Sequence, residues 1–389
     1  MHLIWFGRTP RLVVSEPELI REVLLTRADH FDRYEAHPMI CQFEGYGLSN
    51  LHGERWARRR RVLTPAFHTE NLRMIAPFVA GTVTRMLDEL AERAGGAAGE
   101  AEVDVAEWFQ RVPQEAITFA AFGRRNYDDG AAVFRLQDEL AGYATEAHSK
   151  VYIPGYRFLP TRKNRRVWQL DREIRSHLAK FVTGLQSCSS SHGDDADDGG
   201  GAGMREFMSF MAPAMTAAEI IEESKNFFFA GKETLSNFLT WTTLGMILNE
   251  TLRLYPPAVA MIRTAKEDVE LGGCVVPAGT EVMIPIMAVH HDAAAWGDDA
   301  AEFNPARFAA DDDARRRHPM AFMPFGGGAR VCIGQNMALM EAKVALAVVL
   351  RRFEFRLSPA YVHAPRVLMI LSPQFGAPVI FRPLTSAAA

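Results

Sequence analysis

The sequence predicts a mainly α-helical protein with small β-sheets, and three observations support this fold class. Apolar residues recur at three- and four-residue spacing over most of the first 186 residues, as they do along the buried face of a helix. Short β-rich segments with glycine and proline between them follow at residues 269–285 and near the C-terminus, which is typical of strands. A glycine-rich loop with one cysteine then leads into a long apolar helix, predicted from Gln335 to about Arg351.

Composition narrows the class of protein. The chain has 389 residues, 48% of them apolar, and a net charge of −4, so it can bury a large core and has no charge excess that favours a polyanionic partner. The four cysteines lie far apart without a C-x-x-C pair, which argues against a zinc site or a disulfide framework and indicates a reducing compartment. No linker is apparent between Met1 and Gln186, so we expect a single domain over residues 1–389.

The N-terminal segment, residues 1–8, is too short and too mixed for a membrane span or a signal peptide, since a span needs about 20 apolar residues. A short strand (Leu12–Val14) and a helix are expected next, with Ser15 as the helix cap. The periodicity then predicts helices at about residues 54–63, 71–93, 105–122, 131–147 and 167–185.

Residues 187–203 collect serine, aspartate and glycine and have no apolar anchor. Such a composition predicts a disordered, solvated acidic and glycine-rich loop. The alternative is a tract that binds a metal ion or a basic partner.

Helical structure is expected to return at Thr216, where Glu219 completes a T-x-x-E capping box, and to continue through three phenylalanines to Thr243. Strands are then predicted at residues 269–271, 274–276 and 281–285, with a Gly272-Gly273 turn between the first two. Three more strands are predicted at residues 353–357, 367–371 and 378–381.

Cys332 lies in the segment Phe325-Gly-Gly-Gly-Ala-Arg-Val-Cys332-Ile-Gly334, directly before the predicted helix. Unpaired N–H groups at a helix N-terminus favour a thiolate, and a thiolate is the axial haem ligand that favours O–O bond cleavage. The segment resembles the F-x-x-G-x-R-x-C-x-G signature of the cytochrome P450 family, the haem-thiolate monooxygenases. The alternative is a buried structural cysteine beside a surface loop.

This resemblance implies a cytochrome P450 fold with haem b (iron protoporphyrin IX) as cofactor and Cys332 as the iron ligand. Phe325 and Gly326 would belong to the loop that approaches the haem. Trp56 and Arg60 resemble the family's W-x-x-x-R helix, and Arg263 resembles its propionate-binding arginine. Arginine suits carboxylates, so Arg60, Arg263 and Arg330 are expected to neutralise the two propionates.

Other residues near Trp56 are basic as well. We expect Arg55, Arg58, Arg59 and Arg61 to form a solvated face that helps to dock an acidic reductase. Nucleic-acid binding is not expected, because aromatic residues are not interleaved with these arginines.

Glu250 and Arg253 lie three residues apart in a predicted helix, and Arg307 follows in Phe303-Asn-Pro-Ala-Arg307-Phe308. These residues resemble the family's E-x-x-R helix and its F-x-P-x-R-F segment. The resemblance implies a structural triad in which both arginines clamp the glutamate and hold the loop of Cys332. The alternative is an exposed ion pair between residues three apart.

Glu233 and Thr234, in Ala230-Gly-Lys-Glu-Thr234, resemble the family's oxygen-binding motif in its long central helix. The resemblance implies that Thr234 lies over the iron and that Glu233 helps to relay protons. Opening of the helical turn by the Thr234 hydroxyl is a physical route to this arrangement. The alternative is an ordinary helical threonine beside a solvated glutamate.

Several longer segments, including residues 151–162, 226–243, 284–291 and 363–378, are similar to the plant group that inactivates brassinosteroids by C-26 hydroxylation. This resemblance implies a monooxygenase that hydroxylates an apolar, steroid-like substrate with O2 and with electrons from an NADPH-dependent cytochrome P450 reductase. It also implies a monomer at the cytosolic face of the endoplasmic reticulum membrane. The apolar pocket is expected to include Phe228, Phe229, Ala230, Val259 and Ile262.

Two departures from the family pattern stand out. The family's membrane anchor and proline-rich lead are missing, which indicates N-terminal truncation. The segment ending at Thr243 also runs directly into Leu244, where the family has about two more helices, so the fold is expected to be incomplete. In one straight helix Thr234 and Glu250 would be ~24 Å apart. The alternative function is therefore a non-catalytic, truncated or mis-predicted isoform with impaired haem binding.

Overall fold

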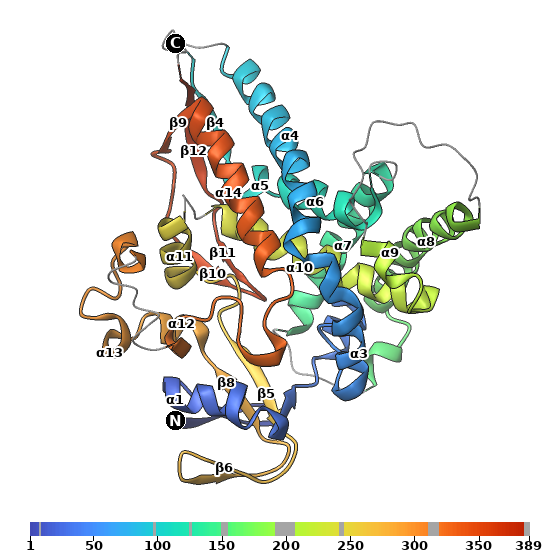
Figure 1. Ribbon diagram of the computed structural model, residues 1–389, viewed down its shortest axis with the longest axis vertical. Coiled ribbons are helices and arrows are strands. Elements are labelled where there is room, and N and C mark those ends of the chain that lie inside the picture. The colour runs from blue at the N-terminus through green and yellow to red at the C-terminus, as the bar shows by residue number, and fades with distance from the viewer. Residues whose placement is uncertain are drawn as a thin grey trace. The chain divides into compact units, whose positions relative to one another are not determined.

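The computed structural model describes residues 1–7, 9–95, 99–123, 127–148, 155–190, 207–240, 245–309 and 319–384 (Figure 1). The chain divides into two compact units. The first unit comprises Met1–Tyr34, Ala80–Arg111 and Glu233–Ala389, and the second comprises Glu35–Val79 and Val112–Lys232. Two long helices, α4 and α10, contribute residues to both units.

A five-stranded sheet in the first unit has the order β1-β2-β8-β5-β3. Its strands are β1 (His2–Phe6), β2 (Thr9–Val13), β3 (Phe31–Arg33), β5 (Met261–Ala265) and β8 (Glu281–Ile284). All neighbours are antiparallel except β2 and β8, which are parallel. This sheet brings residues 2–33 and the segment around Arg263 together.

Three smaller sheets complete the β-structure of the first unit as described. They are β4 (Ala101–Asp104) with β12 (Pro378–Pro383) and β9 (Phe353–Leu357), β6 (Val269–Leu271) with β7 (Cys274–Val276), and β10 (Pro365–Val367) with β11 (Leu371–Pro373). Gly272 and Gly273 both have positive φ in the two-residue β6–β7 turn, which is the geometry that favours glycine in hairpins. The single strand expected at residues 367–371 is wrong, because these residues form a hairpin.

Seven helices lie entirely within the described residues of the first unit. They are α1 (Pro17–Arg21), the π-helix Glu22–Thr26, α5 (Val105–Trp108), α11 (Gly245–Leu254), α12 (Ile286–His290), α13 (Ala293–Trp296) and α14 (Gln335–Arg352). Of these, α1, the π-helix and α12 share a core with the five-stranded sheet. Short 3-10 turns lie at Ala28–His30, Pro305–Phe308, Pro319–Ala321 and Gly328–Arg330. Ile20, Leu24, Val282, Ile286 and Met323 are all buried in this core.

The second unit is helical in its described residues. It contains α2 (Pro38–Glu44), α3 (Gly53–Leu63), α7 (Tyr127–His148), α8 (Arg162–Ser190) and α9 (Phe207–Met211), with 3-10 turns at Thr64–Phe67 and Tyr156–Phe158. The remaining helices are α4 (Thr69–Arg93), α6 (Arg111–Phe122) and α10 (Ala217–Thr240). The mainly α-helical fold class with small sheets is therefore confirmed.

Most helix predictions hold to within a few residues, and the differences are local. The helix expected at residues 105–122 is divided into α5 and α6. Helix α8 continues to Ser190, so residues 187–190 of the predicted loop are helical, and the rest of that prediction, residues 191–203, lies outside the described residues. The capping box is confirmed, because the Glu219 carboxylate accepts from Thr216 N–H at 2.8 Å and Thr216 Oγ1 accepts from Glu219 N–H at 3.3 Å.

The junction between the central helix and the Glu250 helix contains residues 241–244, which lie outside the described residues. On either side α10 ends at Thr240 and α11 begins at Gly245. Among the described helices, none is both long and apolar enough to cross a membrane.

Candidate functional site

The cysteine loop is closed by backbone hydrogen bonds just before α14. Cys332 N–H donates to the Phe325 carbonyl at 2.9 Å, and Val331 N–H donates to the Gly328 carbonyl at 3.1 Å. The Cys332 residue is exposed. The loop therefore leaves Cys332 accessible, two residues before the Gly334 cap of α14.

Glycine is required in this loop for two reasons. Gly326 and Gly328 have φ values of 78° and 69°, which side chains adopt only with strain. A Cβ at Gly328 would also lie 2.1 Å from the Leu24 carbonyl oxygen, whereas one at Gly326 would meet Met261 at 3.6 Å. At Gly328 the loop therefore packs closely against the backbone of the π-helix, which shares a core with the five-stranded sheet.

Three arginines gather beside this loop in the first unit. Arg263 on β5 lies opposite Arg33 on β3 in the antiparallel register, and Arg330 Nη2 donates to Asp32 Oδ1 at 2.9 Å. Burial and the charges of Arg330 and Arg33 lower the pKa of Arg263 to about 10. Burial also lowers the pKa of Arg330, although Asp32 opposes that shift.

This cluster has the properties of an anion site. Like-charged guanidinium groups held together and partly buried destabilise one another unless negative charge is added. Asp32 is a carboxylate of this cluster: it pairs with Arg330 at 2.9 Å, and its charge also acts on Arg263. Planar guanidinium groups bind carboxylates well, so the cluster fits a group with two carboxylates such as haem, with the Cys332 thiol available as ligand. The sequence reasoning missed Arg33 and Asp32, because only the β3–β5 register places them next to Arg263.

Trp56 and Arg60 both lie on α3 in the second unit, four residues apart and half-buried. The Arg60 carbonyl accepts from Thr64 Oγ1 at 2.7 Å. Their proposed role toward the propionates remains a prediction.

The other arginines of α3 differ from one another in burial. Arg55, Arg58 and Arg61 are exposed, as expected, but Arg59 is buried and pairs with Glu219 at 2.5 Å and Glu223 at 2.7 Å. The expectation that Arg59 is solvated is therefore wrong, because two carboxylates of α10 neutralise it. Burial raises the pKa of Glu223, with Arg59 opposing that shift.

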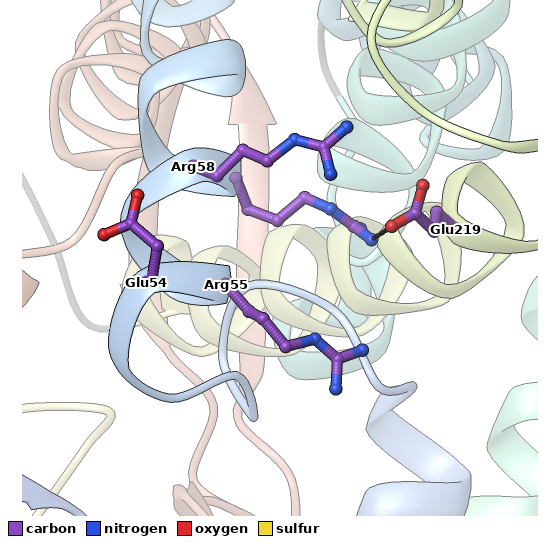
Figure 2. Close-up of a pocket in the computed structure, with 5 residues that line it drawn as sticks. Glu54, Arg55, Arg58 and Glu219 are labelled. Atoms are coloured by element: carbon purple, nitrogen blue, oxygen red, sulfur yellow. Dashed lines mark ion pairs between the residues drawn. The ribbon is translucent and has the colours of Figure 1, made fainter.

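A surface pocket of about 240 Å3 lies beside these groups and is lined by Glu54, Arg55, Arg58, Arg59 and Glu219. Figure 2 draws these lining residues as sticks. Its lining is charged and belongs to the second unit. None of the residues predicted for catalysis or haem binding lines this pocket.

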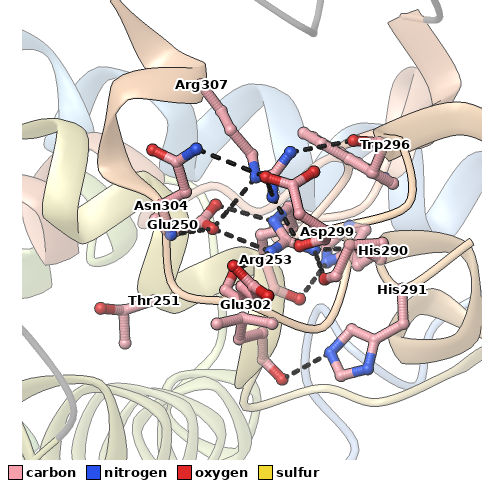
Figure 3. Close-up of polar contacts among 12 residues, drawn as sticks. Glu250, Thr251, Arg253, His290, His291, Trp296, Asp299, Glu302, Asn304 and Arg307 are labelled. Carbon is pink, nitrogen blue, oxygen red and sulfur yellow. Dashed lines mark hydrogen bonds and ion pairs between the residues drawn. The ribbon is translucent and has the colours of Figure 1, made fainter. Parts of the chain in front are cut away.

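Glu250 lies between two arginines and is fully buried (Figure 3). Arg253 donates to it through Nε at 2.7 Å and through Nη2 at 2.8 Å. Arg307 Nε lies 3.4 Å from Glu250 Oε1, and Asn304 N–H donates to the same oxygen at 2.8 Å. The alternative of an exposed ion pair is therefore excluded for Glu250 and Arg253.

The two arginines also bind the surrounding backbone. Arg253 donates to the carbonyls of His290, Ala300 and Glu302 at 2.8, 2.6 and 3.1 Å. Arg307 donates to the carbonyls of Trp296 and Asp299 at 2.9 and 2.6 Å. Arg253 thus joins α11 to the α12–α13 region, and Arg307 joins the Pro305–Phe308 turn to the same region. The sequence did not predict these backbone contacts.

The predicted oxygen-binding residues lie in an uninterrupted part of α10. Thr234 is half-buried, and the side chain of Glu233 lies outside the described part of the structure. Gly231 faces Ile117, where a Cβ would come within 3.2 Å of that side chain.

The apolar residues before Thr234 divide into core and surface. Phe228 is fully buried and packs against Phe134, with ring centroids 4.6 Å apart, and its expected place in a pocket wall stays a prediction. Phe229 is half-buried and contacts Phe43 edge-on at 4.7 Å, while Ala230 is exposed.

Comparisons with known proteins were consistent with one family. A family model described as "Cytochrome P450" matches residues 1–247 and 242–373. Cytochrome P450 734A5 from Oryza sativa subsp. japonica is 89% identical, covering 100% of this chain and 80% of the relative. Cytochrome P450 734A6 from the same organism is 52% identical, and Cytochrome P450 734A1 from Arabidopsis thaliana is 46% identical, each covering 99% of this chain and 80% of the relative.

The comparisons also bear on the junction at residues 241–244. The family model matches in two pieces that meet at residues 242–247. The alignment with the 89% identical rice protein runs over 430 positions, whereas this chain has 389 residues. The alignment therefore has about 41 positions more than this chain has residues, comparable in length to two average helices of about 11–12 residues with their connections.

Proposed function

This chain belongs to the cytochrome P450 family, whose members are haem-thiolate monooxygenases, and we propose that it hydroxylates an apolar, steroid-like substrate. The finer assignment to the side chain of a brassinosteroid rests on similarity to the plant group that carries out this reaction. One oxygen atom of O2 enters the substrate as a hydroxyl group and the other leaves as water. The required electrons come from NADPH through a cytochrome P450 reductase.

The observation that carries this proposal is the position of Cys332 in its loop beside the arginine cluster. Cys332 supplies the thiolate, and haem bound there supplies the chemistry of O2 activation, which thiolate ligation favours. Arg263, Arg330 and Arg33 neutralise the propionates, with Trp56 and Arg60 assigned to the same group from the family motif. The Phe325–Gly328 backbone holds the loop in place.

The remaining residues predicted for the site either deliver protons or hold the cysteine loop in position. Thr234 holds a proton donor near the reacting atoms, and Glu233 helps to deliver protons to it. Glu250, Arg253 and Arg307 touch no reacting atom. They fix the segment before the cysteine loop, because a buried carboxylate held by two guanidinium groups tolerates little movement.

We further propose a monomer that works at the cytosolic face of the endoplasmic reticulum membrane and binds no nucleic acid.

The reduced-CO difference spectrum of the expressed protein tests the haem-thiolate assignment directly. We expect the band characteristic of thiolate ligation, followed by hydroxylation of a brassinosteroid when a plant reductase and NADPH are added. Absence of that band in a folded protein would contradict the assignment. A thiolate-type band without turnover of any steroid would contradict the substrate class alone.

A second candidate function is a non-catalytic isoform with impaired haem binding, and the split family match favours it. The polypeptide between Thr240 and Gly245 is short compared with two helices and their connections. Removing such helices would expose apolar surface that they cover, at about 25 cal/mol per Å2, against a net stability of about 5–15 kcal/mol.

The matched comparison replaces residues 241–244 with the corresponding longer segment of the 89% identical rice protein. If the isoform is impaired, the extended chain should bind stoichiometric haem and melt cooperatively, while the 389-residue chain should not. Equal haem content and equal thermal stability in both proteins would exclude this second function.

A further inference from the structure

His290, the last residue of α12, connects two parts of the first unit through its ring. The residue is fully buried. Its Nδ1 lies 3.2 Å from the Arg253 carbonyl oxygen, and its Nε2 lies 3.0 Å from the Met323 amide nitrogen. A carbonyl only accepts and an amide N–H only donates, so the ring must carry its proton on Nδ1 and accept at Nε2.

The contact with Arg253 runs in both directions (Figure 3). Arg253 Nη1 donates to the His290 carbonyl at 2.8 Å, while the His290 ring donates to the Arg253 carbonyl. Arg253 in turn holds Glu250 through two hydrogen bonds. The imidazole is therefore fixed directly to the buried ion cluster of α11.

The contact with Met323 leads toward the cysteine loop. Met323 is buried in the same core as Val289, and its carbonyl accepts from Gly326 N–H at 2.9 Å. The neighbouring Phe325 carbonyl accepts from Cys332 N–H, also at 2.9 Å. A short series of backbone hydrogen bonds thus leads from the His290 ring to the amide of Cys332.

We propose that His290 is a positioning residue that sets the place of the Cys332 thiol by tying the start of its loop to the Glu250–Arg253 pair. This inference rests on the proposed function, in which Cys332 is the haem ligand. Phe322 stacks on the imidazole with centroids 5.4 Å apart, which restricts rotation of the ring. Burial lowers the pKa of His290 to about 3, so the acceptor nitrogen stays available at neutral pH.

Three variants of the full chain separate this role from general core packing. His290→Leu removes both ring hydrogen bonds, whereas His290→Gln can donate to Arg253 and accept from Met323 through its carboxamide. His291→Leu is the control at the neighbouring, exposed position, because the His291 ring contacts the end of α11 through Nε2 and the Leu254 carbonyl at 3.0 Å rather than the cysteine loop.

The first readout is amide hydrogen exchange at Met323 and Gly326, which needs no haem. Loss of one buried hydrogen bond should accelerate exchange of the Met323 amide about tenfold in His290→Leu. His290→Gln should restore most of the protection, and His291→Leu should leave it unchanged. A Met323 amide that exchanges as fast in the original chain as in His290→Leu would overturn the inference, as would equal acceleration by His291→Leu.

The second readout is the reduced-CO spectrum of the haem-loaded proteins. The thiolate-type band should decrease several-fold in His290→Leu relative to the form without thiolate ligation, and His290→Gln should recover it. An unchanged proportion in His290→Leu would overturn the positioning role. If His290→Leu does not fold, amide exchange in the original chain and in His290→Gln tests the positioning role. Slow exchange of the Met323 amide in both proteins supports that role, and fast exchange in the original chain overturns it.

If the original chain shows no thiolate band, the proposed function fails. The exchange readout still decides whether His290 holds Met323.

Discussion

Glu250 accepts two hydrogen bonds from Arg253, at 2.7 and 2.8 Å, and neither side chain has exposed surface. The substitution Glu250→Gln would leave the Arg253 charge buried with no full counter-charge from this position. We expect the free energy of unfolding of the first unit to fall by about 3–5 kcal/mol. Denaturant titration measures this loss. The control is Glu354→Gln, whose ion pair with Arg382 is exposed at 3.3 Å and should cost less than about 1 kcal/mol. Similar losses in both variants would contradict a special role of the buried pair.

Cys332→Ala should abolish the thiolate-type reduced-CO spectrum, because the loop leaves this residue accessible beside the arginine cluster. Cys274→Ala is the control, since Cys274 is also an exposed free cysteine of the first unit but lies at the β6–β7 turn. The control should keep the spectrum of the original chain. A thiolate band that persists without Cys332 would show that the ligand lies elsewhere.

Arg263→Leu should change stability and haem binding in opposite directions. Without haem the substitution removes a buried cation that Arg330 and Arg33 destabilise, so the melting temperature should rise. With haem it removes a partner of a propionate, and a charged hydrogen bond contributes about 1.5–3 kcal/mol, so haem affinity should fall at least about tenfold. Haem titration and thermal melts measure the two effects. Arg366→Leu, on the exposed strand β10, should affect neither, and a lower melting temperature for haem-free Arg263→Leu would count against an anion site.

Glu341→Gln should flatten the fall in stability that sets in as pH rises above the ordinary carboxyl pKa. Glu341 is buried on α14, its Oε2 has no hydrogen-bond partner among the described residues, and burial raises its pKa well above the usual range. Above the unfolded-state pKa the unfolded chain loses this proton while the folded chain keeps it, so stability falls as pH rises, by at most about 1.4 kcal/mol per pH unit.

The opposite contribution of His290, whose pKa is lowered to about 3, is confined to pH below about 6.5. Melts between pH 6.5 and 8 therefore isolate the carboxyl effect. The difference between Glu341→Gln and the original chain should grow across this window, whereas Glu102→Gln on the exposed part of β4 should give a constant difference. A constant difference for Glu341→Gln as well would mean that Glu341 is ionised in the folded protein.

Thr234→Ala should leave substrate binding intact and reduce product formation on the order of 10²-fold, since only proton delivery needs the hydroxyl. The unused reducing equivalents should appear as hydrogen peroxide. The assay compares NADPH oxidation with product in the chain whose connection at residues 241–244 has been extended. Thr84→Ala, which removes an exposed helical threonine on α4, is the control. Unchanged coupling in Thr234→Ala would exclude the proposed role of Thr234.

The helical class, the Thr216–Glu219 capping box, the β6–β7 hairpin and the helix after Cys332 could all be predicted, because each depends on residues within a few positions of one another. The cysteine motif is also formed by residues close together in the sequence. The prediction of a missing connection likewise depends on one short segment, and the match of the family model in two pieces supports it. The hairpin at residues 365–373 was missed because its short strands are joined by Leu368-Met369-Ile370, which has no glycine or proline to mark a turn, unlike Gly272-Gly273 between β6 and β7.

The sequence by itself determined the family, the position of the cysteine and the identity of the triad residues. Tertiary structure alone decided which charges are buried and with what partners. In the sequence Arg59 cannot be distinguished from its exposed neighbours, but in the fold α10 supplies it with two carboxylates. Arg33 joins the arginine cluster only because β3 pairs with β5, more than 200 residues later. His290 gains its role in the same way, from Arg253 and Met323 on separate segments. The physical reason is that burying a charge or a polar ring is costly unless a partner is present, and partners distant in sequence are brought together only by the fold.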